Sequence, residues 1–189
     1  PGYTQDDKTF KFDPAAAKAE LAKSKYAGKM PTITLTEIGG GASAGPDTDA
    51  YIQSWKEILG ITVEVKQMDS AAFFQEQQAG KLQMFTAGWV MDYPDPEDIL
   101  DLKFNSKSPL NDSRYANPDV DRLLDAARTE GDTNKRLDMY RQAEKLILAD
   151  GGWLPLYFQQ THQVVSANVK GWFDPPMVLP RLRFVEVTR

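Results

Sequence analysis

Strand-like and helix-like segments alternate along the first half of the chain, and this alternation constrains the fold more than any other feature. Apolar residues at every second position indicate strands over residues 32–38 and 61–67. Between them, an apolar stripe at helical spacing over residues 49–59 indicates a helix that Gly60 closes. The alternation predicts an α/β fold with a mixed sheet flanked by helices.

Capping and turn residues predict the remaining elements. Asp13 and Pro14 suit the start of a helix, for which Gly28 supplies a left-handed exit. Residues 82–89 (LQMFTAGW) are almost continuously apolar, which predicts a buried central strand. Further helices are expected from Asp69 or Ser70, from Asn117 and from Asp132, and further strands over residues 153–159, 163–169 and 182–188.

Charge and composition exclude several classes of function. Lysine and arginine number 22 against 27 aspartate and glutamate, which gives a net charge of −5 without a basic run. Such a chain lacks the positive patch that binds nucleic acid or anionic membranes, so we expect no nucleic-acid partner. With no cysteine and one histidine, His162, it cannot form disulfides, thiolate sites or multi-histidine metal sites. We expect no cofactor.

Two features resemble active-site motifs only superficially. The glycine-rich segment 39–49 lacks the Gly-Lys-Ser/Thr of a phosphate-binding loop and the spacing of a dinucleotide site, so we interpret it as a flexible connection. Ser43 within it lacks the strand-to-helix turn of a nucleophile elbow. His162 lies between two predicted strands, where a surface or hairpin position is expected.

Residues 88–100 (GWVMDYPDPEDIL) form the strongest candidate site. Its carboxylates are interleaved with Trp89 and Tyr93, and two prolines restrict the backbone, so the loop can be preorganised. Asp92 follows an apolar run at a position where ligands often meet open α/β sheets. A carboxylate beside aromatic rings suits an ammonium group, through charge pairing and cation–π attraction.

The same segment has other interpretations. It can be a solvated turn in which Asp95 or Asp98 caps the next short helix, and this is the preferred interpretation for Asp95, Glu97 and Asp98. A calcium loop would need the D-x-D-x-D-G ligand spacing, which is missing. Two catalytic carboxylates for glycoside hydrolysis would make the chain a hydrolase whose turnover depends on Asp92 or Asp95.

Gly88-Trp89 followed by Asp92-Tyr93-Pro94-Asp95-Pro96 resembles the signature of family 5 extracytoplasmic solute-binding proteins, the oligopeptide, dipeptide and nickel receptors of ABC importers. Four other stretches resemble the family pattern in the same order along the chain: residues 12–21, 52–65, 111–124 and 136–156. The resemblance implies the second, C-terminal lobe of a type II periplasmic-binding-protein-like fold.

The resemblance also implies a division of the chain. Residues 1–168 would form the C-terminal ligand-binding lobe, and residues 169–189 a tail that returns to an N-terminal lobe preceding Pro1. The chain begins without an initiator methionine, a charged n-region or an apolar h-region, so we expect a processed start or a piece of a longer protein. Without its first lobe, the tail is expected to associate with a neighbouring copy through an unpaired strand.

Site roles follow from the resemblance, residue by residue. Asp92 stands where family peptide receptors pair a carboxylate with the ligand α-ammonium, and Trp89 where an aromatic residue lines a side-chain pocket. Gly88 would permit close backbone approach to an extended peptide. Thr86 stands where some oligopeptide receptors carry a basic residue, which argues against strict tripeptide recognition. In a sugar receptor, Trp89 and Tyr93 would instead be stacking platforms.

The resemblance implies the substrate-binding component of an ABC importer and not an enzyme. Two lobes would close on a short peptide in the periplasm or at the cell surface, and the closed receptor would dock on the permease subunits. A receptor lobe for another solute, such as an oligosaccharide, an opine or a chelated metal, is the alternative. A carboxylate-based hydrolase is a third, less favoured hypothesis.

Overall fold

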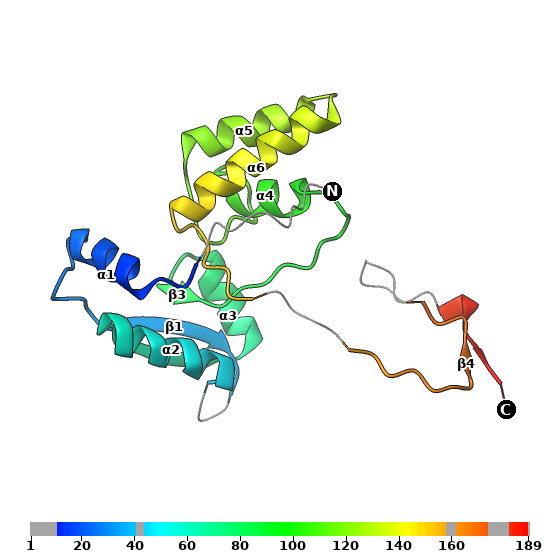
Figure 1. The fold of residues 1–189 in the computed structure, drawn as a ribbon, viewed down its shortest axis with the longest axis horizontal. Coiled ribbons are helices and arrows are strands. Elements are labelled where there is room, and N and C mark those ends of the chain that lie inside the picture. The colour runs from blue at the N-terminus through cyan, green and yellow to red at the C-terminus, as the bar shows by residue number, and fades with distance from the viewer. Residues whose placement is uncertain (1–10, 41–43, 158–161, 174–181, 189) are drawn as a thin grey trace. The chain divides into compact units, whose positions relative to one another are not determined.

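The computed structural model describes residues 11–40, 44–157, 162–173 and 182–188 (Figure 1). The chain divides into two compact units. The sheet unit is Thr4–Gly88, and the helical unit is Trp89–Arg189 together with Pro1–Tyr3. This division does not test the predicted boundary between a lobe over residues 1–168 and a tail over residues 169–189, which stays a prediction.

The sheet unit contains three parallel strands in the order β2-β1-β3. They are β1 (Ile33–Ile38), β2 (Val63–Met68) and β3 (Met84–Phe85), and the helices are α1 (Pro14–Lys23), α2 (Pro46–Leu59) and α3 (Ser70–Gln78). Leu35 of β1 and Phe73 of α3 are buried, and Phe73 packs edge-on against Phe85. The predicted α/β alternation is therefore present, and the apolar side chains of both element types meet in one core.

The predicted central strand over residues 82–89 is wrong. Only Met84–Phe85 are strand, and β1 takes the central position. The Thr86 N–H still donates to the Thr36 carbonyl oxygen at 3.3 Å, after which Ala87 and Gly88 are exposed. An apolar run does not reveal which strands will flank it, because strand pairing is decided by residues distant in sequence.

The starts of α1 and α3 agree with the predictions, whereas the end of α1 and the start of α2 do not. The Asp13 and Asp69 carboxylates each accept the backbone N–H three residues later in the chain, from Ala16 and Ala72, as N-caps do. Helix α1 ends at Lys23 instead of continuing to Gly28, because Ser24 is already extended (ψ 146°). Helix α2 begins at Pro46, three residues before the predicted start, and ends at the left-handed Gly60 (φ 68°).

The helical unit is built on α4 (Glu97–Phe104), α5 (Pro118–Thr129) and α6 (Thr133–Ala149), which pack against one another (Figure 1). Asn117 and Asp132 cap α5 and α6 as predicted. Apolar residues at helical spacing face inward and exclude water, which stabilises the unit. The buried core consists of Leu100, Phe104, Val120, Leu124, Ala127, Tyr140, Ala143 and Ile147.

The C-terminal part of the helical unit contains less strand than predicted. Its described strands, β4 (Val169–Lys170) and β5 (Glu186–Val187), form an antiparallel pair. A 3₁₀ turn over Leu182–Phe184 precedes β5. Residues 153–157 and 163–168 are not strand, and residues 158–159 lie outside the described part. Short apolar runs adopt strand structure only where a partner strand satisfies their backbone groups.

Nowhere in the described part of the chain is a helix both long enough and apolar enough to cross a membrane.

Candidate functional site

The five predicted site residues fall in both units. Thr86 and Gly88 end the sheet unit, whereas Trp89, Asp92 and Tyr93 begin the helical unit. The last three lie on one segment, residues 89–96, which leads into α4 and which we call the site loop. Tyr93 is 41% exposed, Trp89 is half-buried and Asp92 is exposed.

The Asp92 carboxylate is available to a ligand. Its side chain is exposed, and no hydrogen bond or ion pair joins it to the described residues. Its backbone, in contrast, is held, because the Asp92 N–H donates to Asp98 Oδ2 at 2.8 Å. An anionic group is thus presented to solvent from a fixed stretch of backbone.

Asp98 is the residue that sequence reasoning assigned wrongly. It is not the N-cap of α4, which is Pro96, and its side chain is completely buried. Besides the Asp92 N–H, its Oδ2 accepts the Trp89 indole N–H at 3.2 Å. The sequence held no signal for this role, because Asp95, Glu97 and Asp98 are neighbouring acids without a distinguishing pattern.

A buried lysine covers one face of Trp89. Lys103 Nζ lies 4.3 Å from the centroid of an indole ring, and the Lys103 side chain is only 7% exposed. The same ammonium donates to Asp112 Oδ2 at 2.8 Å and to the Leu110 carbonyl oxygen at 3.2 Å. The indole is therefore held at its N–H edge by Asp98 and on one face by Lys103, a cation–π contact.

Asp95 anchors the site loop to α6. Its carboxylate accepts both terminal N–H groups of Arg136, at 2.8 and 2.7 Å, and also the Glu97 N–H at 3.0 Å. Hydrogen bonding to Arg136 lowers the pKa of Asp95 below its ordinary value, and the same bonds raise the pKa of Arg136. The Arg136 guanidinium also stacks 4.9 Å from the ring centroid of Tyr140, a core residue.

Asp95 does not suit the role of general acid in a hydrolase. A glycosidase needs one carboxylic acid with a raised pKa, whereas the pKa of Asp95 is lowered. Within the described residues, no group of three or more His, Cys, Asp or Glu side chains is placed to hold a metal ion. The site loop, held by hydrogen bonds with Asp98 and Arg136, carries one exposed carboxylate and two aromatic rings.

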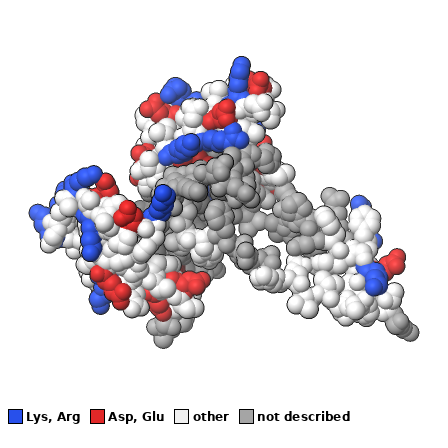
Figure 2. Space-filling view, viewed as in Figure 1, with Lys and Arg blue, Asp and Glu red and all other residues white. Residues whose placement is uncertain are grey.

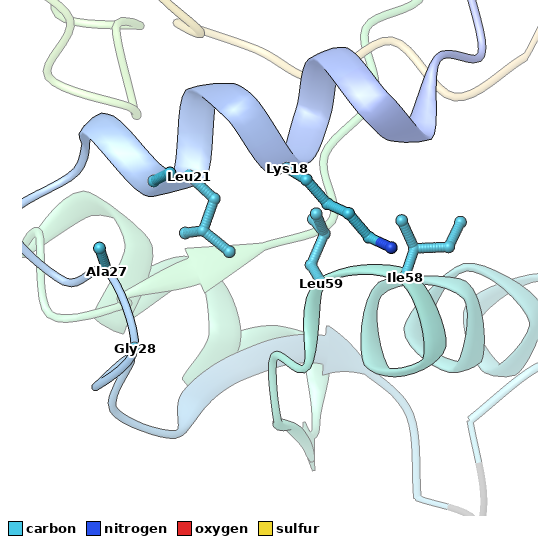
Figure 3. Close-up of a pocket in the computed structure, with 7 residues that line it drawn as sticks. Lys18, Leu21, Ala27, Gly28, Ile58 and Leu59 are labelled. Carbon is cyan, nitrogen blue, oxygen red and sulfur yellow. The ribbon is translucent and has the colours of Figure 1, made fainter.

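The other features singled out in the sequence lie away from the site loop. His162 is exposed, as expected of a surface residue, and Ser43 with Gly41 falls outside the described residues. A shallow pocket between α1 and α2 lies within the sheet unit and contains none of the predicted site residues (Figure 3). It is lined by Lys18, Leu21, Ala22, Ala27, Gly28, Ile58 and Leu59.

Charge is mixed over the visible surface. On the face shown in Figure 2, acidic and basic residues of the described chain are interspersed. Elsewhere in the described chain, charged residues form surface ion pairs, such as Arg122 with Asp119 and Arg141 with Asp138. Interspersed charges create no extended field of one sign on this face.

Comparison with known proteins identifies the family. Residues 1–111 match the model for bacterial extracellular solute-binding proteins, family 5 Middle. The chain belongs to family 5. The resemblance inferred from the site loop and the four other stretches is thereby confirmed.

Curated family 5 relatives include dipeptide-binding protein DppE of Bacillus subtilis, 30% identical over 94% of this chain and 34% of DppE. Oligopeptide-binding protein OppA of the same organism is 29% identical over 92% of this chain and 32% of OppA. Periplasmic murein peptide-binding protein MppA of Escherichia coli is 28% identical over 84% of this chain. The chain spans about one third of the length of these relatives.

Solved structures agree on the fold. The murein tripeptide-binding protein MppA of Escherichia coli matches with a TM-score of 0.79 and 25% identity, over 93% of this chain and 35% of MppA. DppA from Helicobacter pylori, solved in complex with the peptide STSA, matches with a TM-score of 0.80 and 24% identity, over 100% of this chain and 37% of DppA. The predicted fold, a lobe of a periplasmic binding protein, is confirmed. The family and these relatives are solute-binding proteins.

Proposed function

We propose that this family 5 chain is part of the substrate-binding component of an ABC importer and binds short peptides, with the Asp92 carboxylate pairing the ligand ammonium. The observation that carries the proposal is the exposed Asp92 carboxylate, without a partner among the described residues, on a backbone that Asp98 holds. The peptide-binding names of the relatives support the choice of ligand class.

The site loop matches the chemistry of a peptide amino terminus. A primary ammonium group needs a negative partner, which Asp92 supplies, and it is attracted to aromatic faces such as those of Trp89 and Tyr93. In open solvent such a pair is worth about 1 kcal/mol or less. Closure of a second lobe over the loop would exclude water and strengthen the pair several-fold. Binding and closure are thus coupled in the proposed mechanism.

Gly88, the residue before Trp89, is the proposed point of backbone approach for the peptide. Gly88 is exposed, and a Cβ added there would meet no atom of the described residues within 4 Å, which supports close approach of a peptide backbone. An extended peptide could then hydrogen-bond to it in the manner of an added strand. Thr86 is neutral, and we propose that it does not pair with the ligand carboxylate.

The C-terminal part of the chain would meet the first lobe. It exposes many large apolar side chains, which is unusual for a surface that faces only water. We expect residues 169–189 to pack on the N-terminal lobe of the same receptor, or on a second copy when that lobe is absent. The exposed large apolar residues of this range that the structure describes are Trp172, Phe173, Leu182, Phe184 and Val187.

The proposed partners and location follow from the receptor role. A loaded receptor would dock on the permease subunits of the importer, so it would work outside the cytoplasm, in the periplasm or at the cell surface. Relatives such as MppA carry the word periplasmic in their names. No step of this role makes or breaks a covalent bond, so we propose that the chain is not an enzyme.

The test is an NMR titration of the four tryptophan indole N–H signals. Trp55 lies in α2, Trp89 in the site loop, Trp153 against the helical core, and Trp172 after β4, so each reports on a different place. The titrants are a pool of short peptides and the same pool N-acetylated, at about 1 mM and above, because half a cleft is expected to bind with about −4 kcal/mol.

We expect the Trp89 signal to move with the free-amine pool alone, and the movement to disappear in Asp92→Asn. Asp119→Asn is the matched control, since Asp119 is a 71%-exposed acid on α5. Equal movement with both pools, or with oligosaccharides, would favour a receptor for another solute. Unchanged binding by Asp92→Asn would refute the ammonium pairing.

A further inference from the structure

Asp98 is an unusual residue to find buried. It is completely inaccessible, yet no ion pair to a described residue compensates its charge. Its Oδ2 accepts two hydrogen bonds and its Oδ1 accepts none. Burial of a carboxylate is costly unless it is paired or well hydrogen-bonded, so this placement opposes folding. A residue kept at such a cost is a candidate for a functional role.

Both groups that Asp98 holds belong to the site loop. The Trp89 indole N–H lies nine positions earlier in the chain and the Asp92 N–H six positions earlier, and a single oxygen accepts both. Hydrogen bonds to a charged acceptor are about twice as strong as neutral ones. The aromatic side chain and the carboxylate-bearing residue of the loop are therefore tied to each other through Asp98.

A favourable interaction with the dipole of helix α4 does not explain why Asp98 is buried against Trp89. An acid in the first helical turn interacts favourably with the helix dipole, and Asp98 is the second residue of α4. Asp119 is the second residue of α5 and provides the same benefit while 71% exposed. The dipole therefore requires no burial and no contact with Trp89.

We propose that Asp98 is the positioning residue of the binding site: its buried carboxylate fixes the Trp89 indole relative to the Asp92 backbone, so the loop is preorganised for its ligand. Lys103 assists by occupying one face of the indole, and the ligand would contact the other face. Preorganisation raises affinity because less conformational entropy is lost on binding. The inference deepens the proposed function and rests on it.

The experiment compares Asp98→Asn and Asp98→Ala with Asp119→Asn in the whole 189-residue chain. The first readout needs no ligand: hydrogen exchange and chemical shift of the Trp89 indole N–H and the Asp92 amide. The Trp153 indole serves as the internal reference for an intact helical core, since it packs on Phe104 with ring centroids 5.0 Å apart. The second readout is affinity for the free-amine peptide pool.

We expect Asp98→Ala to speed exchange at the Trp89 indole and the Asp92 amide by about tenfold or more, with the Trp153 signal unchanged. Asp98→Asn keeps an acceptor oxygen and loses the charge, so a smaller increase is expected. Peptide affinity should fall by about tenfold in Asp98→Ala and stay unchanged in Asp119→Asn.

Two results would overturn the inference: native-like exchange at both protons in Asp98→Ala, or equal loss of peptide affinity in Asp119→Asn. If Asp98→Ala also loses the Trp153 signal, the isosteric Asp98→Asn decides, and native-like exchange there would count against the role. A native chain that binds no peptide would contradict the proposed function, whereas the exchange measurement would still decide whether Asp98 holds the loop.

Discussion

Removing the Asp95 carboxylate should destabilise the helical unit by a measurable and pH-dependent amount. The pair with Arg136 is bidentate, at 2.7 and 2.8 Å, and the two side chains are only 26% and 20% exposed. Fully exposed pairs contribute about 0–1 kcal/mol, and hydrogen bonds to charged groups about 1.5–3 kcal/mol. Because this pair is partly buried, we expect Asp95→Asn to lower the free energy of unfolding by about 1–2 kcal/mol at pH 7.

The sign of the pH dependence follows from the lowered pKa. The Asp95 carboxyl is harder to protonate in the folded chain than in the unfolded chain, so its contribution is complete above its ordinary pKa of 3.8. It is lost as the pH falls from there through the lower folded-state pKa. The difference between wild type and Asp95→Asn should therefore shrink when the pH falls below about 4.

The assay is urea unfolding at pH 7 and at several lower values, followed through the Trp153 indole of the helical core. Asp119→Asn is the control, because its exposed pair with Arg122 should change stability by less than about 0.5 kcal/mol. A difference for Asp95→Asn that is below about 0.5 kcal/mol, or that stays constant down to pH 2, would refute this account of the pair.

Three further predictions test the core, the C-terminal pair of strands and the buried phenols. Leu124→Ala should cost about 2–5 kcal/mol in chemical unfolding, because Leu124 is fully buried; a cost below 1 kcal/mol would contradict the packing. Gly171→Ala should separate β4 from β5, since its Cβ would lie 2.0 Å from the Phe184 carbonyl oxygen and φ is +70°; unchanged strand amide shifts would argue otherwise. Burial raises the pKa of Tyr115 and of Tyr140 to about 12, and for Tyr115 a hydrogen bond to Asp150 adds to this effect. Ultraviolet titration should therefore show both phenols un-ionised at pH 10.5. Ionisation above that pH should be absent from the matching Tyr→Phe variants.

The starts of helices with a side-chain cap were predictable because capping is local, whereas α2, which has no side-chain cap, begins three residues before its predicted start. Asp13, Asp69, Asn117 and Asp132 each accept an N–H group two or three residues further along the chain, so a short window of sequence contains the whole interaction. Strand positions were less predictable. The run over residues 82–89 has the composition of a central strand, yet β1 lies at the centre because pairing depends on segments far apart in the chain.

The candidate site shows the same division between local and distant causes. Its location in residues 88–100, its acidic and aromatic character and its family resemblance all follow from the sequence. The separate roles of its three central acids do not. Asp92 is exposed, Asp95 is paired with Arg136 forty-one positions away, and Asp98 is buried and accepts the Trp89 indole N–H.

The sequence by itself determined the α/β class, the starts of the side-chain-capped helices, the family and the candidate site segment, because each depends on residue type and short-range order. Only the tertiary structure decided which acid of that segment faces solvent and which supports the loop. Burial and pairing assign those roles, and both depend on α4 and α6 packing against the loop. Identical carboxylates in one short stretch thereby acquire different chemistry.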